Sequence, residues 1–462
     1  MKPLSFSTLG LDQAVLSNLE HLGYQSMTPV QQETLPHSLK GKDIIGKAKT
    51  GSGKTASFAL PLLLKIDPTS FKVQSLVLCP TRELATQVTN EIRKLARFQQ
   101  NVKVLTLCGG SPFGPQKGSL ERGAHVVVGT PGRIKDHLRK ANLNLDHAHT
   151  LVLDEADRML DMGFLDDVEW ITSFIPENRQ TMLFSATFPD QLDTLSSRLL
   201  KDAFIAEVSD TEPAPDIEQF FYKVDKSDRE DSLISILAKH QPSHAVIFCH
   251  TKQGVIDLAN RLRHQGHSVL PLQGDMDQKQ RDQTLIRFSN HSVTLLIATD
   301  VAARGLDIES IDTVINYELP RDSAVYTHRI GRTGRAGKKG TAINLYTASE
   351  QYKLDEIQQQ HSPDNIRFKT TADIDFNVDT VLSKPPMITL YIDVGKKDKI
   401  RPGDLVGALT STRQLTGDDL GKIAIMPFAS YVAIKRELSH KALSALENGK
   451  VKGKSVKAKL MS

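Results

Sequence analysis

The 462-residue sequence has few cysteines and no long hydrophobic segment. Its three cysteines, Cys79, Cys108 and Cys249, lie far apart, without the paired spacing of a zinc site or a disulfide framework, and are best explained as buried thiols. No segment approaches the roughly 18 apolar residues of a transmembrane helix. Asp12 and Gln13 stand where a signal peptide would have its apolar core. The sequence therefore predicts a cytoplasmic protein in a reducing compartment, without membrane contact.

Net charge is also small, but it is unevenly distributed. The chain carries 58 Lys and Arg against 54 Asp and Glu, a formal net charge of +4. Residues 383–462 hold 15 basic and 7 acidic side chains, a net charge of +8, which leaves −4 for residues 1–382. A basic segment joined to a nearly neutral body indicates a polyanionic partner for the C-terminal part. The alternative is a solvated lysine-rich surface that serves only solubility.

Two stretches alternate short apolar runs with helical patterns, which is typical of parallel sheets covered by helices on both faces. A segment rich in proline and acidic residues at 210–216 separates them as a linker, and 347–384 is polar and weakly patterned. The expected strands are 74–79, 102–107, 125–128, 150–153 and 181–184 in the first stretch, and 245–249, 268–270, 294–298, 313–316 and 342–345 in the second.

A phosphate-binding loop and an acidic pair define the candidate nucleotide site. In the glycine-rich loop at 48–55, Ala48 stands where the general pattern has Gly, Lys54 would hold the outer phosphates and Thr55 would reach Mg²⁺. Asp154 and Glu155 directly follow the apolar run 151–153, so Asp154 is predicted to hold Mg²⁺ through water and Glu155 to orient the attacking water. The other loop residues predicted to contact the nucleotide are Lys49, Thr50, Gly51, Ser52 and Gly53. An exposed acidic turn is a poor alternative directly after a buried strand.

Arginines recur at three-residue steps among glycines in the second stretch, at Arg329, Arg332 and Arg335. This stretch has no phosphate loop of its own. We therefore expect Arg332 and Arg335 to act as arginine fingers on a nucleotide held by the first domain. A generic basic helix start would explain the charge but not the glycine spacing.

Taken in order, these motifs resemble the DEAD-box RNA helicases over about residues 1–350. The acidic motif Asp-Glu-Ala-Asp at 154–157 and Ser-Ala-Thr at 185–187 match that family's pattern. The resemblance implies an α/β fold with two tandem RecA-like parallel-sheet domains, 1–209 and 216–370. It further implies ATP and Mg²⁺ as cofactors and local separation of short RNA duplexes.

The resemblance also implies roles for individual residues. Tyr24 is expected to stack on adenine and Gln31 to hydrogen-bond its edge, while Gly305 and Asp307 approach the nucleotide from the second domain. Coupling between hydrolysis and strand separation is expected at Asp157, Ser185, Thr187 and His328, with Ser185 bonded to Asp157. The residues expected to contact the RNA backbone are Pro80, Thr81, Arg82, Gly110, Thr130, Arg133, Thr251, Gly274 and Thr299.

The C-terminal segment 384–462 predicts a small α+β domain like an RNA recognition motif. Its expected elements are a strand at 388–394, a helix at 401–411, strands at 420–426 and 430–434, a helix at 438–447 and a strand at 455–460. Of the stacking aromatics of such a domain, only Tyr391 and Tyr431 remain. The basic residues Lys450, Lys452, Lys454, Lys457 and Lys459 alternate, which favours a phosphate-facing edge over a merely solvated strand face.

A helicase pair with such a tail resembles a bacterial branch of the family that grips a hairpin of 23S ribosomal RNA during large-subunit assembly. The expected partner is therefore a structured hairpin of 23S rRNA, and no obligatory protein partner is indicated. Two alternatives stay open: a general messenger-RNA helicase in RNA decay, and an ATP-gated RNA clamp that does not unwind.

Overall fold

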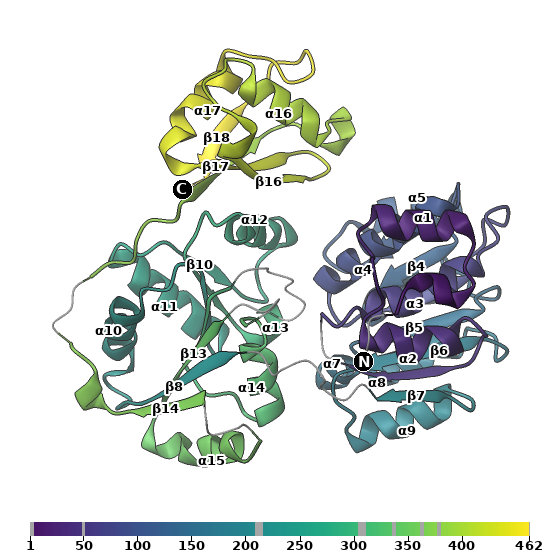
Figure 1. The fold of residues 1–462 in the computed structure, drawn as a ribbon, viewed down its shortest axis with the longest axis horizontal. Coiled ribbons are helices and arrows are strands. Elements are labelled where there is room, and N and C mark those ends of the chain that lie inside the picture. The colour runs from purple at the N-terminus through teal and green to yellow at the C-terminus, as the bar shows by residue number, and fades with distance from the viewer. Residues whose placement is uncertain are drawn as a thin grey trace. The chain divides into compact units, whose positions relative to one another are not determined.

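The computed structural model describes residues 4–48, 51–207, 216–303, 311–334, 339–360, 365–376 and 380–461 (Figure 1). The chain divides into two compact units, Met1–Pro213 and Ala214–Ser462, and the second unit contains two of the three sheets. Among the described helices, none is long and apolar enough to cross a membrane. Five residues with predicted roles lie outside the described residues: Lys49, Thr50, Gly305, Asp307 and Arg335.

The first unit is built on a seven-stranded parallel sheet in the order β3-β4-β2-β5-β6-β1-β7. Its strands are β1 (Ile44–Lys47), β2 (Ser75–Leu78), β3 (Val104–Leu107), β4 (Val126–Gly129), β5 (Thr150–Asp154), β6 (Gln180–Ser185) and β7 (Phe204–Glu207). Its helices are α1 (Gln13–His21), α2 (Pro29–Ser38), α3 (Lys54–Leu64), α4 (Arg82–Leu95), α5 (Phe113–Glu121), α6 (Pro131–Arg139), α7 (Ala156–Asp161), α8 (Leu165–Thr172) and α9 (Asp190–Leu199).

Helices cover both faces of this sheet, and the alternation of side chains along the strands explains why. Val77 packs in a core cluster with residues of α1–α4, whereas its neighbours Leu76 and Leu78 belong to a second cluster with residues of α6–α9. Successive strand residues point to opposite faces, so a strand buried on both sides reads as a continuous apolar run. The five strands expected in the first stretch are therefore all present.

The second unit begins with another seven-stranded parallel sheet, in the order β10-β11-β9-β12-β13-β8-β14. Numbered from its own first strand, this order is the same as in the first unit. Its strands are β8 (Ile217–Lys223), β9 (Ala245–Phe248), β10 (Val269–Leu272), β11 (Leu295–Ala298), β12 (Thr313–Asn316), β13 (Gly340–Tyr346) and β14 (Ile366–Lys369). Its helices are α10 (Arg229–His240), α11 (Lys252–His264), α12 (Gln278–Ser289), α13 (Asp300–Ala303), α14 (Ser323–Ile330) and α15 (Gln351–Gln360).

The C-terminal sheet is antiparallel, with the order β16-β17-β15-β18. Its elements are β15 (Met387–Ile392), α16 (Pro402–Thr410), β16 (Leu420–Ile425), β17 (Ser430–Lys435), α17 (Ser439–Glu447) and β18 (Ala458–Met461). The predicted βαββαβ order is confirmed. Alternate residues such as Leu390 and Val432 form the core beneath the two helices, which leaves the other face of the sheet to Thr389, Tyr391 and Tyr431.

That second face of the C-terminal sheet contacts the second RecA-like domain. Gln283 of α12 donates from Nε2 to the Tyr431 hydroxyl at 3.2 Å, and the Ser292 and Thr389 hydroxyls lie 2.8 Å apart. Tyr431 is only 3% exposed. Contrary to the sequence-based prediction, Tyr431 is therefore placed as a packing residue, and it has no free face on which an RNA base could stack.

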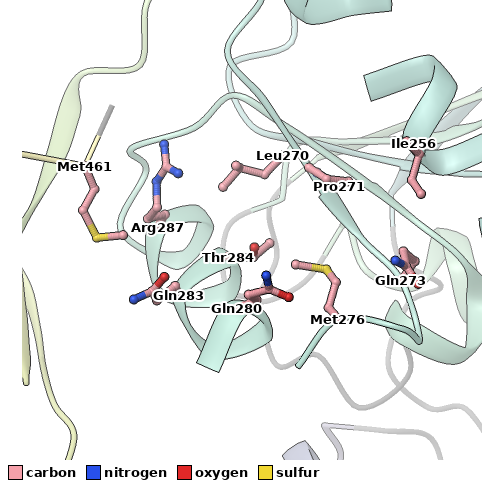
Figure 2. A pocket seen from close by; sticks show the side chains of 10 residues that line it. All are labelled: Ile256, Leu270, Pro271, Gln273, Met276, Gln280, Gln283, Thr284, Arg287 and Met461. Atoms are coloured by element: carbon pink, nitrogen blue, oxygen red, sulfur yellow. The ribbon is translucent and has the colours of Figure 1, made fainter. Parts of the chain in front are cut away.

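A cavity of about 310 Å³ borders the same contact (Figure 2). Thr284 and Arg287 of α12 line it together with Met461 of the last strand, and Gln273 and Met276 line its other side. The C-terminal strand therefore faces α12 close to the loop that follows β10.

Candidate functional site

The phosphate-binding loop joins β1 to α3. Gly51 and Gly53 have φ angles of +88° and +92°, in the left-handed region that favours glycine. A Cβ on Gly53 would lie 2.6 Å from Gln31 Nε2, so this position also has no room for a side chain. Helix α3 begins at Lys54, and its first backbone N–H groups have no partner within the helix. The loop is thus built to receive an anion at a helix N-terminus.

Asp154 ends the buried strand β5, and its environment fits a metal ligand. The side chain is 3% exposed, and its Oδ1 is a buried atom without a hydrogen-bond partner. Burial raises the pKa of this carboxyl to about 6, partly opposed by the nearby Lys54 charge. Lys54 is itself buried and donates to the Ala48 carbonyl at 2.9 Å. A buried carboxylate with a spare oxygen, beside a loop that can hold phosphates, is a donor set that suits Mg²⁺.

Glu155 follows in an unusual backbone conformation, with a φ angle of +53°. Its carboxylate accepts from Arg158 Nη1 at 2.5 Å, and both side chains are nearly fully buried. The turn from β5 into α7 holds Glu155 beside Asp154, as the sequence predicted. Arg158, its partner, was not predicted; the i,i+3 spacing of opposite charges at the start of α7 is the signal that could have found it.

Three of the predicted coupling residues form a connected network between β6 and α7. The Ser185 hydroxyl accepts from the backbone N–H of Asp157 at 3.1 Å. The Asp157 carboxylate in turn accepts from the Thr187 backbone N–H and hydroxyl, both at 3.0 Å. The predicted bond between Ser185 and Asp157 is confirmed, but it is made by the main chain of Asp157, while Thr187 holds the side chain.

Of the two predicted adenine-reading residues, Gln31 is tied to the phosphate loop and Tyr24 is bonded to α4. Gln31 Nε2 donates to the Gly53 carbonyl at 3.0 Å, while its Oε1 accepts from the Thr28 backbone N–H at 2.9 Å. The Tyr24 hydroxyl donates to Glu91 at 2.7 Å, and burial together with this carboxylate raises the pKa of Tyr24. Gln31 thus connects the segment before α2 directly to the loop that would hold the phosphates.

The predicted RNA-contact residues of the first domain follow three adjacent strands, β3, β4 and β2. Thr81 caps α4 by accepting from the Leu84 N–H at 3.2 Å, and Thr130 precedes α6. A Cβ on Gly110 would lie 1.9 Å from Arg82 Nη1, so a side chain there would displace the Arg82 guanidinium from its place against the loop. These residues, together with Pro80 and Arg133, lie at the carboxyl ends of one half of the sheet. The nucleotide residues follow β5 and β1 in the other half.

Gln116, which was not predicted, connects the segment after β3 to α6 within the RNA-contact half of the first domain. Its Nε2 donates to the Cys108 carbonyl at 2.9 Å, and its Oε1 lies 3.0 Å from both Arg133 Nη1 and His137 Nε2. Because the amide N–H points to Cys108, the oxygen must accept from His137, which fixes the proton on Nε2 of that ring. Burial lowers the pKa of His137 to about 4, so the ring is neutral near pH 7.

The second domain repeats this placement on the corresponding strands. Thr251 follows β9 and caps α11, Gly274 lies in the loop after β10, and Thr299 follows β11. Arg281 of α12 donates to the carbonyl of Gln273 at 3.4 Å, just before Gly274. Eight residues separate Gln273 from Arg281, as they separate Cys108 from Gln116.

Arg329 and Arg332 lie in different environments. Arg329 is 2% exposed, contacts both carboxylate oxygens of Asp300 at 2.6 and 2.7 Å, and donates to Asn316 at 2.7 Å. It is therefore a buried structural residue. Arg332 is 8% exposed and lies beyond the end of α14, whose last turn contains His328.

Three protein-family models match this chain, one for each of the three sheets. Residues 28–195 match the DEAD/DEAH box helicase family, 228–337 match the helicase conserved C-terminal domain, and 389–460 match the DbpA RNA binding domain. The chain is 49% identical over 461 residues to the ATP-dependent RNA helicase DbpA of Escherichia coli, covering 99% of both sequences. It is 44% identical to the ATP-dependent RNA helicase CshA of Listeria monocytogenes, over 77% of this chain and 68% of that protein.

Two solved structures are also similar to this chain over most of its length. Saccharomyces cerevisiae Dbp5 bound to RNA and ADP BeF3 matches with a TM-score of 0.72 and 31% identity, covering 80% of this chain and 96% of that one. Mss116p bound to single-stranded RNA and AMP-PNP matches with the same TM-score at 27% identity, covering 80% of each chain.

Proposed function

The chain belongs to the DEAD-box family of ATP-dependent RNA helicases, and on that premise we propose that it remodels 23S ribosomal RNA in the cytoplasm during assembly of the large ribosomal subunit. Its DbpA-type C-terminal domain would bind a structured hairpin of that RNA, and the helicase domains would open a short duplex nearby. The single observation that carries this proposal is a compact, basic RNA-binding domain packed against the second helicase domain.

The first domain supplies the groups for ATP hydrolysis. The glycine loop and Lys54 would hold the phosphates, and Gln31 would connect adenine recognition to Gly53. Thr55 and Asp154 would hold Mg²⁺, which when bound neutralises phosphate charge in the transition state. Glu155 would orient the attacking water, with Arg158 fixing the direction of its carboxylate. Arg332, with Arg335, would contact the charge that develops on the transferred phosphate.

RNA would contact the carboxyl ends of corresponding strands in the two helicase domains. In each domain the candidate contacts follow three adjacent strands, and their hydroxyl, glycine and arginine groups suit contact with phosphates and riboses. Such contacts do not read sequence. A preference for one RNA therefore requires a further element, and the chain has one in its C-terminal domain.

The C-terminal domain can supply that preference by tethering. Its contacts with α12 place it on the same compact unit as Thr251, Gly274 and Thr299. A hairpin bound to this domain would therefore stay close to the RNA-contact loops of the second helicase domain. Tethering raises the local concentration of the neighbouring duplex without any change in the catalytic residues.

Removal of residues 383–462 tests this proposal. The remaining protein should hydrolyse ATP with any RNA at high concentration, but with weak RNA affinity and no preference. The measurement is the RNA concentration that half-activates hydrolysis, determined with hairpin-bearing fragments of 23S rRNA and with scrambled RNAs of equal length. The proposal fails if the intact protein does not distinguish these RNAs, or if the truncated protein distinguishes them equally well.

A further inference from the structure

The C-terminal domain has three aromatic side chains, and they differ sharply in exposure. Tyr431 is 3% exposed against the second helicase domain, and Tyr391 is partly buried beside it, with ring centroids 5.6 Å apart. Phe428 is 65% exposed. It is the sole exposed large apolar side chain in the described residues 384–461. The aromatic group that faces solvent is thus not on the sheet but in the loop between β16 and β17.

The backbone around Phe428 is held by a second loop, which follows β15. The Lys396 N–H donates to the Met426 carbonyl at 2.9 Å, and the Lys397 N–H donates to the Pro427 carbonyl at 3.0 Å. A Cβ on Gly395 would lie 2.3 Å from the Met426 oxygen, so the two loops approach as closely as glycine allows. These contacts fix the position from which the Phe428 ring projects.

One lysine lies over this ring, and two more are tied to the loop that holds it. Lys397 Nζ lies 4.0 Å from the centroid of the Phe428 ring, a cation–π contact. The turn at 450–454 joins the same loop cluster, because Lys452 Nζ donates to the Lys399 carbonyl at 2.7 Å and Lys454 Nζ lies 3.1 Å from Asp398 Oδ1. Three of the five lysines predicted to line a strand edge therefore lie on a turn, which is tied to the loop that holds the exposed aromatic ring.

We propose that Phe428 is a stacking platform for an unpaired base of the bound RNA, with Lys397, Lys452 and Lys454 near the flanking phosphates. A flat apolar ring among cations matches the two parts of a single-stranded nucleotide, since any base can stack on the ring while its phosphate meets the lysines. Tyr431 cannot serve this role because α12 covers it. The inference deepens the proposed function and rests on RNA binding by this domain.

The test compares substitutions in the full-length protein, with in vitro transcribed 23S rRNA as the probe and excess transfer RNA as competitor. Phe428→Ala should raise the dissociation constant about tenfold, the order expected for one lost stacking contact. Phe428→Trp should restore binding to within about twofold of wild type, since a larger ring still stacks. Tyr352→Ala is the matched control, because Tyr352 is also 65% exposed but lies on α15.

The salt dependence separates stacking from charge. Phe428→Ala should leave the slope of log affinity against log salt unchanged, whereas the double variant Lys452→Met with Lys454→Met should reduce it by up to about two units. Irradiation at short ultraviolet wavelength should also attach a nucleotide to the peptide that contains Phe428.

The outcomes distinguish failure of the stacking platform from failure of the proposed function. If the lysine variant weakens binding while Phe428→Ala binds like wild type, RNA binding by this domain stands and the stacking platform is wrong. If neither variant weakens binding, the proposed function itself fails. Crosslinks confined to the sheet face, or loss of binding in Phe428→Trp as large as in Phe428→Ala, would also overturn the stacking platform.

Discussion

The two RecA-like domains share one strand order, yet only the first has the glycine-rich sequence of a phosphate-binding loop after its first strand. The pairing registers align their strands residue by residue: Thr150 pairs with the first residue of β2, as Thr313 pairs with the first residue of β9. Counting onward, the Asp154 position corresponds to Tyr317, and the Glu155 position corresponds to Glu318. The scaffold thus fixes where a side chain is presented, and the side chain decides the chemistry.

The second domain fills the corresponding positions with groups that already have partners. Glu318 accepts from the His250 backbone N–H at 2.7 Å, and the Tyr317 ring lies 5.8 Å from the Arg229 guanidinium. The loop after β8, residues 224–228, contains no glycine. Asp154 instead has a buried oxygen without a partner. A buried polar atom without a partner calls for an explanation, and a bound metal ion would provide one for Asp154.

The largest expected effect tests whether the second domain contributes to catalysis. Arg332→Ala should lower RNA-stimulated ATP hydrolysis by about 10³-fold or more, because an arginine on the developing phosphate charge contributes on that order. ATP affinity should change little, since the first domain holds the phosphates. Steady-state rates and nucleotide titrations measure the two quantities. Arg367→Ala is the control, because Arg367 forms an exposed ion pair with Glu218. Equal losses in affinity and rate would contradict this role.

The next prediction compares the corresponding glutamates. Glu155→Gln should reduce ATP turnover by about 10²–10⁴-fold while ATP and RNA binding persist, because an amide cannot act as the base that orients water. Glu318→Gln should keep turnover within a few-fold of wild type, since its amide oxygen can still accept from His250. Single-turnover hydrolysis at saturating ATP and RNA measures both variants. Near-normal turnover in Glu155→Gln would place the base elsewhere.

A smaller effect is expected at the residue that connects the RNA-contact half of the first domain. Gln116→Leu removes a buried amide that contacts Cys108, Arg133 and His137, and such a loss is worth about 1–3 kcal/mol. RNA affinity should fall roughly tenfold, with the Michaelis constant for ATP unchanged. Lys117→Ala is the control on the same helix, because Lys117 is about half exposed. An equal change in the ATP constant would show a general folding defect.

The smallest expected effect concerns stability. Most substitutions destabilise a protein, but the one considered next should stabilise it. Since burial raises the pKa of Asp154 to about 6 from 3.8, the folded state binds more protons than the unfolded state between these values. The nucleotide-free protein should therefore gain stability as pH falls from above 6 toward 4, by at most about 3 kcal/mol. Asp154→Asn should be more stable than wild type at pH 7.5 and should lack this pH dependence.

Mg²⁺ and ATP provide the control for that prediction. They should raise the melting temperature of wild type more than that of Asp154→Asn, because the variant lacks the metal-binding carboxylate. Thermal melts from pH 4 to 8, with and without Mg²⁺ and ATP, would measure both effects. A variant that is less stable than wild type without nucleotide would show that Asp154 has a structural role.

Much of the fold could be predicted because most of the parallel strands are apolar runs with turn residues on either side. The five strands expected in each stretch exist, and the C-terminal βαββαβ order is confirmed. The strands that were missed lie at or near one edge of each sheet: β1, β7, β8 and β14. The run at β1 includes Gly46, while β14 is partly exposed. Helix α15 falls within the polar segment that gave no clear pattern.

Sequence by itself determined the catalytic chemistry of this protein, because a phosphate loop and a strand-end acidic pair are local patterns that need no knowledge of distant contacts. Tertiary structure alone decided how similar residues are placed. Arg329 and Arg332 look alike in sequence, but Arg329 is buried against Asp300 and Asn316, whereas Arg332 lies beyond the end of α14. Tyr431 and Phe428 are both aromatic, yet α12 covers one and leaves the other in solvent. Burial depends on which segments fold against each other, and that information is spread over the whole chain.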